Sequence, residues 1–208
     1  MSVLTDSLNR IMAWLEVNRP DYAALFLPGL SDEEIRDKLV NLELELPEEI
    51  YELYRWRNGT EDEDMKSLVP SIEFRHLDQA IKYYNNFVGN PLTVFDEKDY
   101  QNIFEKLDIN RGNIYGNKFL FPFSCTNGRY YSAVLLSKEQ QRYSPIVHIS
   151  FHFELKVIYR NLTGMMQTFA ECLETGVYYL DEEGFLDGNE QKMLPIFQKY
   201  NPGLTLIF

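Results

Sequence analysis

The histidines and cysteines are the residues of this sequence whose side chains could bind a metal ion or attack a substrate. His148 and His152 are four residues apart, the spacing of a helical zinc pair. The surrounding segment 146–153 has the composition of a strand, however, and there the two side chains would lie about 13 Å apart, too far to share one ion. Cys125 is expected in a turn with no base beside it. The sequence therefore predicts neither a metal site nor a nucleophile.

Longer signatures of catalysis do not occur in the sequence either. It contains no Gly-x-Ser-x-Gly nucleophile elbow and no glycine-rich phosphate loop, and Gly112, Gly116 and Gly128 are isolated turn glycines. Nothing among its 32 Asp and Glu residues singles out a pair for acid–base catalysis. We predict that the protein is not an enzyme and uses no cofactor. A small-molecule binder or enzyme with a cleft between sheet and helices stays open as an alternative.

The net charge is the first indication of a partner. The 32 acidic residues against 20 Lys and Arg give a formal charge of -12. Such a chain repels nucleic acids and anionic membranes, whereas it attracts a basic protein. Solubility alone would also explain the charge. We expect a basic protein partner, no nucleic acid and no membrane, and the sequence does not predict an oligomeric state.

The cellular compartment follows from the cysteines and the apolar pattern. Cys125 and Cys172 are too few for a disulfide framework, which favours a reducing compartment. Asp6 and Arg10 interrupt the N-terminal apolar pattern, so it does not resemble a signal peptide. No apolar stretch is long enough to span a bilayer. We therefore expect a cytoplasmic protein.

Aromatic and acidic side chains are the candidates for contacting the partner, because the chain carries 14 Phe, 14 Tyr and 2 Trp. Trp56 lies off the apolar stripe of its predicted helix, so it either packs under a loop or faces the partner. The acidic run 61–64 lacks the alternation and central glycine of a calcium loop, which leaves a solvated charge run or a contact for a basic surface. The candidate partner-binding residues are Trp56, Asn58, Glu61, Asp62, Glu63, Asp64, Tyr130 and Tyr131.

Apolar residues at helical spacing predict helices through the first half of the chain. Ser31 with Glu34 forms a capping box, Pro47 opens a further helix, and Asn58-Gly59 is typical of a helix end. The predicted helices cover about 4–18, 31–41, 47–57, 78–87 (capped by Asp78) and 100–107, with a short strand at 72–74.

The second half predicts a sheet. The β-rich runs 119–123 and 130–136 flank Thr126-Asn127-Gly128, which indicates a hairpin. The elements predicted after it are strands at 146–153 and 155–159, a helix over 162–173, an acidic turn at 181–190, and a helix near Tyr200 that Pro195 should kink or split. The fold class is therefore α+β, with a mixed, largely antiparallel sheet flanked by N-terminal and C-terminal helices. We expect one domain, 1–208, with a core of about 28–180.

The order of several short motifs resembles the SUKH superfamily, which is named after fungal cell-wall-assembly and glucan-synthesis regulators. The run that begins at Leu46-Pro47 and closes on Asn58-Gly59 is similar to the signature helix of the family. Pro28-Gly29-Leu30 resembles the segment that precedes this helix in the family, and Phe121-Pro122-Phe123 with Gly128 resembles the family's central hairpin. The helix near Asn161 with Phe169 resembles the closing helix, and 199–204 resembles the C-terminus of bacterial members. One departure is Val134-Leu135-Leu136, where members often carry an Asp, so a ligand role of that Asp does not transfer.

The resemblance spans nearly the whole chain and implies a recognition module. Bacterial members resemble immunity proteins, which neutralise toxins of polymorphic toxin systems. We therefore expect a protein-binding module that neutralises a toxin, with a nuclease as one possibility. The alternative is a regulatory scaffold that binds endogenous signalling or cell-wall-synthesis proteins, as the fungal members do.

Overall fold

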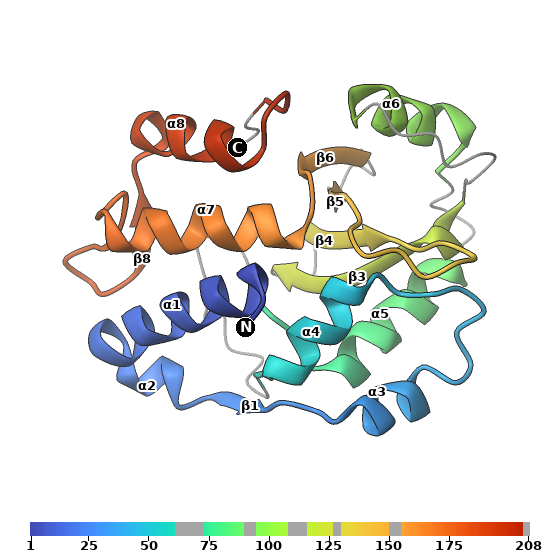
Figure 1. The fold of residues 1–208 in the computed structure, drawn as a ribbon, viewed down its shortest axis with the longest axis horizontal. Helices are drawn as coiled ribbons and strands as arrows, with labels where there is room; N and C mark the ends of the chain where they lie inside the picture. The colour runs from blue at the N-terminus through green and yellow to red at the C-terminus, as the bar shows by residue number, and fades with distance from the viewer. Residues whose placement is uncertain (61–72, 90–94, 108–115, 127–129, 150–154, 206–208) are drawn as a thin grey trace.

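The computed structural model describes residues 1–60, 73–89, 95–107, 116–126, 130–149 and 155–205 (Figure 1). The helices are α1 (Val3–Asn18), α2 (Pro20–Ala23), α3 (Asp32–Lys38), α4 (Glu48–Trp56), α5 (Leu77–Val88), α6 (Glu97–Leu107), α7 (Leu162–Glu174), α8 (Glu190–Tyr200) and the 3₁₀ turn η1 (Asn117–Phe119). The strands are β1 (Phe26–Pro28), β2 (Arg57–Thr60), β3 (Leu120–Thr126), β4 (Tyr130–Leu135), β5 (Ile146–Ile149), β6 (Leu155–Tyr159), β7 (Tyr178–Leu180) and β8 (Leu186–Gly188). The α+β class predicted from the sequence is confirmed.

The main sheet has four antiparallel strands in the order β3-β4-β5-β6, so the predicted hairpin and its two following strands pair as expected. Its turn, 127–129, lies outside the described residues, as do 150–154 in the predicted third strand. Cys125 was predicted in the turn, but β3 continues to Thr126 and pairs Cys125 with Tyr131, so its side chain is buried within the sheet.

The predicted helix end at Asn58-Gly59 is wrong. Helix α4 ends at Trp56, and Arg57 begins the strand β2, which pairs antiparallel with β1. The carbonyl oxygen of Tyr54, near the end of α4, accepts a hydrogen bond from the amide of Leu30 at 2.9 Å, so this open group of the helix end has a partner. Gly59 still has a positive φ of 66°, and a Cβ there would meet the backbone of Arg75.

Smaller differences concern helix ends. His76, not Asp78, caps α5, because its Nδ1 accepts a hydrogen bond from the amide of Gln79 at 3.3 Å. Helix α3 ends at Lys38 rather than near 41. Helix α8 continues through Pro195, so this residue does not split it. Proline has no N–H group to donate to the carbonyl group one turn earlier, but Pro195 is exposed, so water can hydrate that carbonyl group.

Two further predictions are met only in part. The predicted acidic turn 181–190 contains the turn of the β7–β8 hairpin and the strand β8 itself, and α8 begins at its last residue. The predicted strand 72–74 begins outside the described residues, and Phe74 and Arg75 form only isolated bridges. The other predicted helices and the capping box of Ser31 with Glu34 are present.

Helix α5 covers one face of the sheet at β3, while α1 and α7 pack side by side in a separate layer (Figure 1). Aromatic contacts join α5 to the sheet: the rings of Tyr84 and Phe121 lie 5.9 Å apart, and those of Phe87 and Tyr131 lie 4.9 Å apart. In the layer formed by α1 and α7, the large buried side chains are Leu, Ile, Met and Phe. No helix within the described ranges is long and apolar enough to cross a membrane.

Helix α4 is docked on α7 and α1 through a buried and a half-buried carboxylate. Glu49 is only 3% exposed, and it accepts hydrogen bonds from the amides of Leu162 and Thr163 at 3.3 and 2.7 Å, as well as from the Thr163 hydroxyl at 2.6 Å. One turn further along, Glu52 accepts from the amide of Thr5 at 3.0 Å. Each carboxylate therefore satisfies the open amides at a helix N-terminus, of α7 and α1 respectively.

We predict that Glu49→Ala lowers the free energy of unfolding by about 2 to 4 kcal/mol, because the buried amides of α7 lose their acceptor. Burial raises the pKa of Glu49, and the hydrogen bonds at the helix N-terminus oppose this rise. The folded state therefore binds the proton more tightly than the unfolded chain. Relative to Glu49→Gln, which does not titrate, the wild type is most stable below about pH 4 and loses stability as the pH rises toward neutrality.

Urea unfolding of the wild type, Glu49→Gln and Glu49→Ala at several pH values between about 4 and 7 measures both effects. Parallel pH profiles of the wild type and Glu49→Gln would contradict the raised pKa.

Candidate functional site

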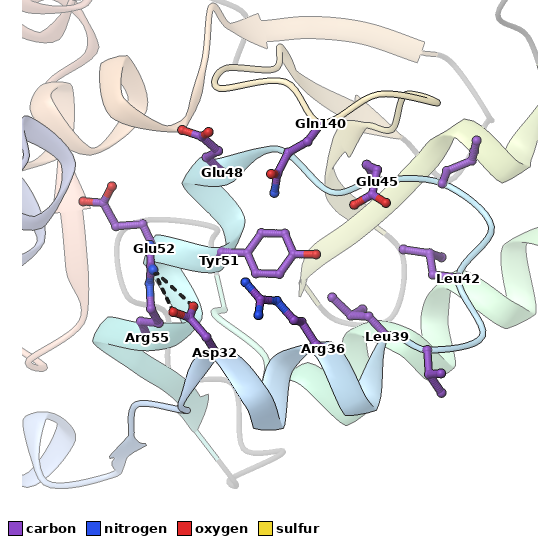
Figure 2. Close-up of a pocket in the computed structure, with 12 residues that line it drawn as sticks. Asp32, Arg36, Leu39, Leu42, Glu45, Glu48, Tyr51, Glu52, Arg55 and Gln140 are labelled. Atoms are coloured by element: carbon purple, nitrogen blue, oxygen red, sulfur yellow. Dashed lines mark hydrogen bonds and ion pairs between the residues drawn. The ribbon is translucent and has the colours of Figure 1, made fainter.

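A groove lies between α3, α4 and the segment 39–48 that joins them (Figure 2). It encloses about 580 Å³ and is lined by Asp32, Arg36, Leu39, Val40, Leu42, Leu44, Glu45, Glu48, Tyr51, Glu52, Arg55 and Gln140. We call it the α3–α4 groove. Its lining combines a tyrosine ring with four carboxylates and two guanidinium groups, which makes it the candidate binding site of this chain.

Backbone contacts at Gly29 set the spacing of the two helices that form the groove. The amide of Leu30 donates to the carbonyl oxygen of Tyr54 at 2.9 Å, which docks the start of α3 on the C-terminal end of α4. This approach leaves no room beside Gly29, where a Cβ would lie 1.8 Å from the carbonyl oxygen of Arg55. An ion pair between Asp32 and Arg55 at 3.1 Å closes the same end of the groove.

The other end of the groove is held by contacts between the segment before α4 and the segment after β4. The amide of Glu45 donates to the carbonyl oxygen of Ser137 at 2.8 Å, and the amide of Glu48 donates to that of Gln141 at 2.8 Å. These bonds bring Gln140 over the groove, with its amide directed toward Tyr51 (Figure 2). Backbone bonds therefore hold the groove walls in place, and the side chains of Glu45 and Glu48 remain free to bind.

Tyr51 lies in the middle of the groove and is half-buried (Figure 2). Burial raises the pKa of its phenol; the negative charges of Glu45 and Asp32 add to this rise, and the positive charge of Arg36 opposes it. The phenol therefore stays neutral at physiological pH. A neutral ring with carboxylates around it presents an electron-rich face and an O–H group to a ligand.

The charged side chains of the groove divide into occupied and unoccupied groups. Asp32 is paired with Arg55, and Glu52 is bound to the N-terminus of α1 through Thr5. Glu45, Glu48 and Arg36 are exposed and form no ion pair within the described part of the chain. The groups free to bind a ligand are therefore two carboxylates and one guanidinium.

None of the predicted partner-binding residues that the structure describes lines this groove. Trp56 packs against Phe26 with the ring centroids 6.0 Å apart, and its indole N–H donates to Asn9 at 2.9 Å. Asn58 accepts a hydrogen bond from the amide of Leu77 at 2.9 Å, so it caps the start of α5. Both side chains thus have contacts within the protein that account for them.

The predicted tyrosines differ in exposure. Tyr130 is 45% exposed and stacks on His148, with 5.7 Å between ring centroids, whereas Tyr131 is half-buried between Tyr83 and Phe87. The acidic run Glu61, Asp62, Glu63 and Asp64 lies outside the described residues. Of the predicted set that the structure describes, Tyr130 is therefore the side chain most accessible to a partner.

The residues with possible metal or nucleophilic chemistry do not form a site in the described ranges. No group of three or more His, Cys, Asp and Glu side chains there could hold a metal ion. Cys125 and Cys172 are both buried, and burial raises the pKa of Cys172 to about 12, which keeps it a thiol. Burial and the charge of Lys156 lower the pKa of His148.

A comparison with models of protein families and a search of curated proteins found no match to this sequence. The geometry of the α3–α4 groove is therefore the main guide to a binding site.

The groove could not be recognised in the sequence, because its residues there have the pattern of ordinary exposed helix and loop positions. In the linear sequence Glu48 stands in the first turn of a predicted helix, where an acidic side chain complements the helix dipole, and no motif marks Tyr51. The spacing of Glu48, Tyr51 and Arg55 at intervals of three and four residues places them on one helix face, and this signal could have found the wall contributed by α4. The opposite wall comes from α3 and the segment after it, whose approach no local pattern encodes.

We predict that Gly29→Ala destabilises the protein by about 3 kcal/mol or more, because its Cβ would overlap a backbone carbonyl that cannot move independently. Gly176→Ala is the matched control: Gly176 has a φ of 69° but open space around it, so only the backbone strain of about 1 to 2 kcal/mol applies. Chemical denaturation of the two variants measures the difference. Equal losses in both would contradict close packing of α3 on α4.

Proposed function

We propose that this protein binds a basic protein through the α3–α4 groove and the acidic surface around it, and that the partner is a toxin which it neutralises. The observation that carries the proposal is the pair of unoccupied carboxylates, Glu45 and Glu48, beside an accessible tyrosine in a groove with rigid walls. The net charge of -12 favours approach of a basic partner over a long range.

The composition of the groove favours a protein ligand over a small-molecule substrate. Its rim is charged and its apolar side chains lie along one wall, whereas small-molecule sites are mostly apolar and enclosed. Tyrosine is enriched at the centres of protein interfaces, because it provides a large contact area with little loss of side-chain entropy. The resemblance to bacterial immunity proteins, given by the order of the sequence motifs, points to a toxin as the partner.

We predict that the product of the neighbouring gene is the toxin. Co-expression of this chain with that toxin should rescue growth, and the two proteins should purify as a complex. Because steering by charge is screened by salt, the affinity should fall roughly tenfold between about 0.01 M and about 1 M NaCl, mostly through a slower association rate. Titration calorimetry and stopped-flow mixing measure the two quantities. An affinity that does not change with salt would contradict the proposal, as would the absence of both growth rescue and a complex. A complex with an endogenous protein, in place of the toxin, would indicate a regulator.

A further inference from the structure

We propose that the α3–α4 groove is a receptor for one arginine side chain of the partner, whose guanidinium group lies against Tyr51 and between Glu45 and Glu48. This inference rests on the proposed function, since it names the chemical group that the same groove recognises. It depends on three features of the groove: an aromatic face, two unoccupied carboxylates and an apolar wall.

The aromatic face comes from Tyr51. The ring is partly exposed at the centre of the groove, and its phenol stays neutral (Figure 2). A cation is attracted to the face of such a ring, and arginine also stacks its flat guanidinium group on it. Cations of the chain itself occupy other aromatic rings in this way, for example Arg57 over Trp56 at 5.6 Å and Arg19 over Tyr22 at 5.0 Å. No such contact involving Tyr51 is present among the described side chains.

The two carboxylates supply the countercharge. Glu45, on the segment before α4, lies beside the hydroxyl end of Tyr51, whereas Glu48, at the start of α4, has its carboxylate directed away from the ring (Figure 2). Because Glu48 is exposed and forms no ion pair within the described residues, its side chain can turn toward a ligand. A guanidinium group has five N–H donors in one plane and can donate to two carboxylates at once. The ammonium group of lysine is a compact charge without this geometry. The arrangement therefore favours arginine over lysine.

An apolar wall accommodates the methylene stem of the side chain. Leu39 and Leu42 line the groove on the side away from the Asp32–Arg55 ion pair (Figure 2), and Leu44 also belongs to its lining. Long basic side chains pack their stems on apolar surface while the charged end remains polar. The volume of about 580 Å³ is sufficient for an arginine side chain together with part of its backbone.

Arg36 offers a test of whether the groove binds a cation or an anion. Its guanidinium group lines the same groove from α3 and carries the charge that would repel an arginine ligand. If the groove binds a cation, removal of this charge strengthens binding. If the groove instead binds a carboxylate or phosphate, Arg36 is the group that holds it, and its removal abolishes binding.

The probe is N-acetyl-arginine amide, titrated into the full chain labelled with ¹⁵N and followed by NMR. We expect binding in the millimolar range with shifts at the amides of Tyr51 and Glu48, and weaker binding of the lysine analogue. Glu45→Gln, Glu48→Gln and Tyr51→Leu should each weaken binding by about threefold to tenfold, while Arg36→Gln should strengthen it about twofold to fivefold. The neutral citrulline analogue, which has nearly the same shape, should not bind.

Glu182→Gln is the control variant, because it changes the net charge as Glu48→Gln does, but in the exposed turn between β7 and β8. It should bind the probe like the wild type, and unchanged melting temperatures should confirm that all variants are folded. Equal weakening by Glu182→Gln and Glu48→Gln, binding of the citrulline analogue, or loss of binding in Arg36→Gln would each overturn the inference.

The arginine site and the proposed function can fail separately. If the toxin complex forms and the groove variants bind the toxin like the wild type, the arginine site is wrong and so is the groove as the contact for the toxin, whereas neutralisation of a basic toxin stands. If the probe binds with the expected pattern but no toxin complex forms, the arginine site stands and the proposed function is wrong.

Discussion

The docking of α4 by its own carboxylates is the constraint on which the rest of the structure depends. Glu49 and Glu52 are three residues apart, and each accepts hydrogen bonds from the first turn of a different helix, α7 or α1. Because the N-terminal amides of a helix have no partners within it, a carboxylate there satisfies donors that would otherwise be left open. Both helices therefore begin at α4, and this common origin fixes their side-by-side packing.

The same helix uses its other face for the groove. Glu48, Tyr51 and Arg55 follow one another at helical spacing along the wall of the groove, whereas Ile50, Leu53 and Tyr54 are buried in the core. The three acidic residues of this helix differ in role with their position on it. Glu49, on the inner side, caps α7, and Glu48, on the outer side, contributes charge to the groove. Glu52 lies at the boundary, where it caps α1 and also lines the groove.

The contacts that hold the groove walls favour binding at this surface. The groove is closed at one end by the ion pair of Asp32 with Arg55 and at the other by backbone hydrogen bonds from Glu45 and Glu48. A site whose walls are fixed before binding loses less conformational entropy when a ligand arrives. A partner therefore has to order only the exposed side chains of Glu45 and Glu48, and not the backbone that carries them.

Sequence alone determined the α+β class, the antiparallel order of β3 to β6 and the capping box of α3, because turn residues and helix caps act over a few neighbouring positions. Only the tertiary structure decided that Asn58-Gly59 lies in a strand, since its partner β1 is distant in sequence. The same is true of the burial of Cys125, since α5 packs on the strand that carries it. The same holds for the groove: its two walls meet through the close approach at Gly29 and through contacts to 137–141. Long-range packing sets these positions, and local propensity does not encode it.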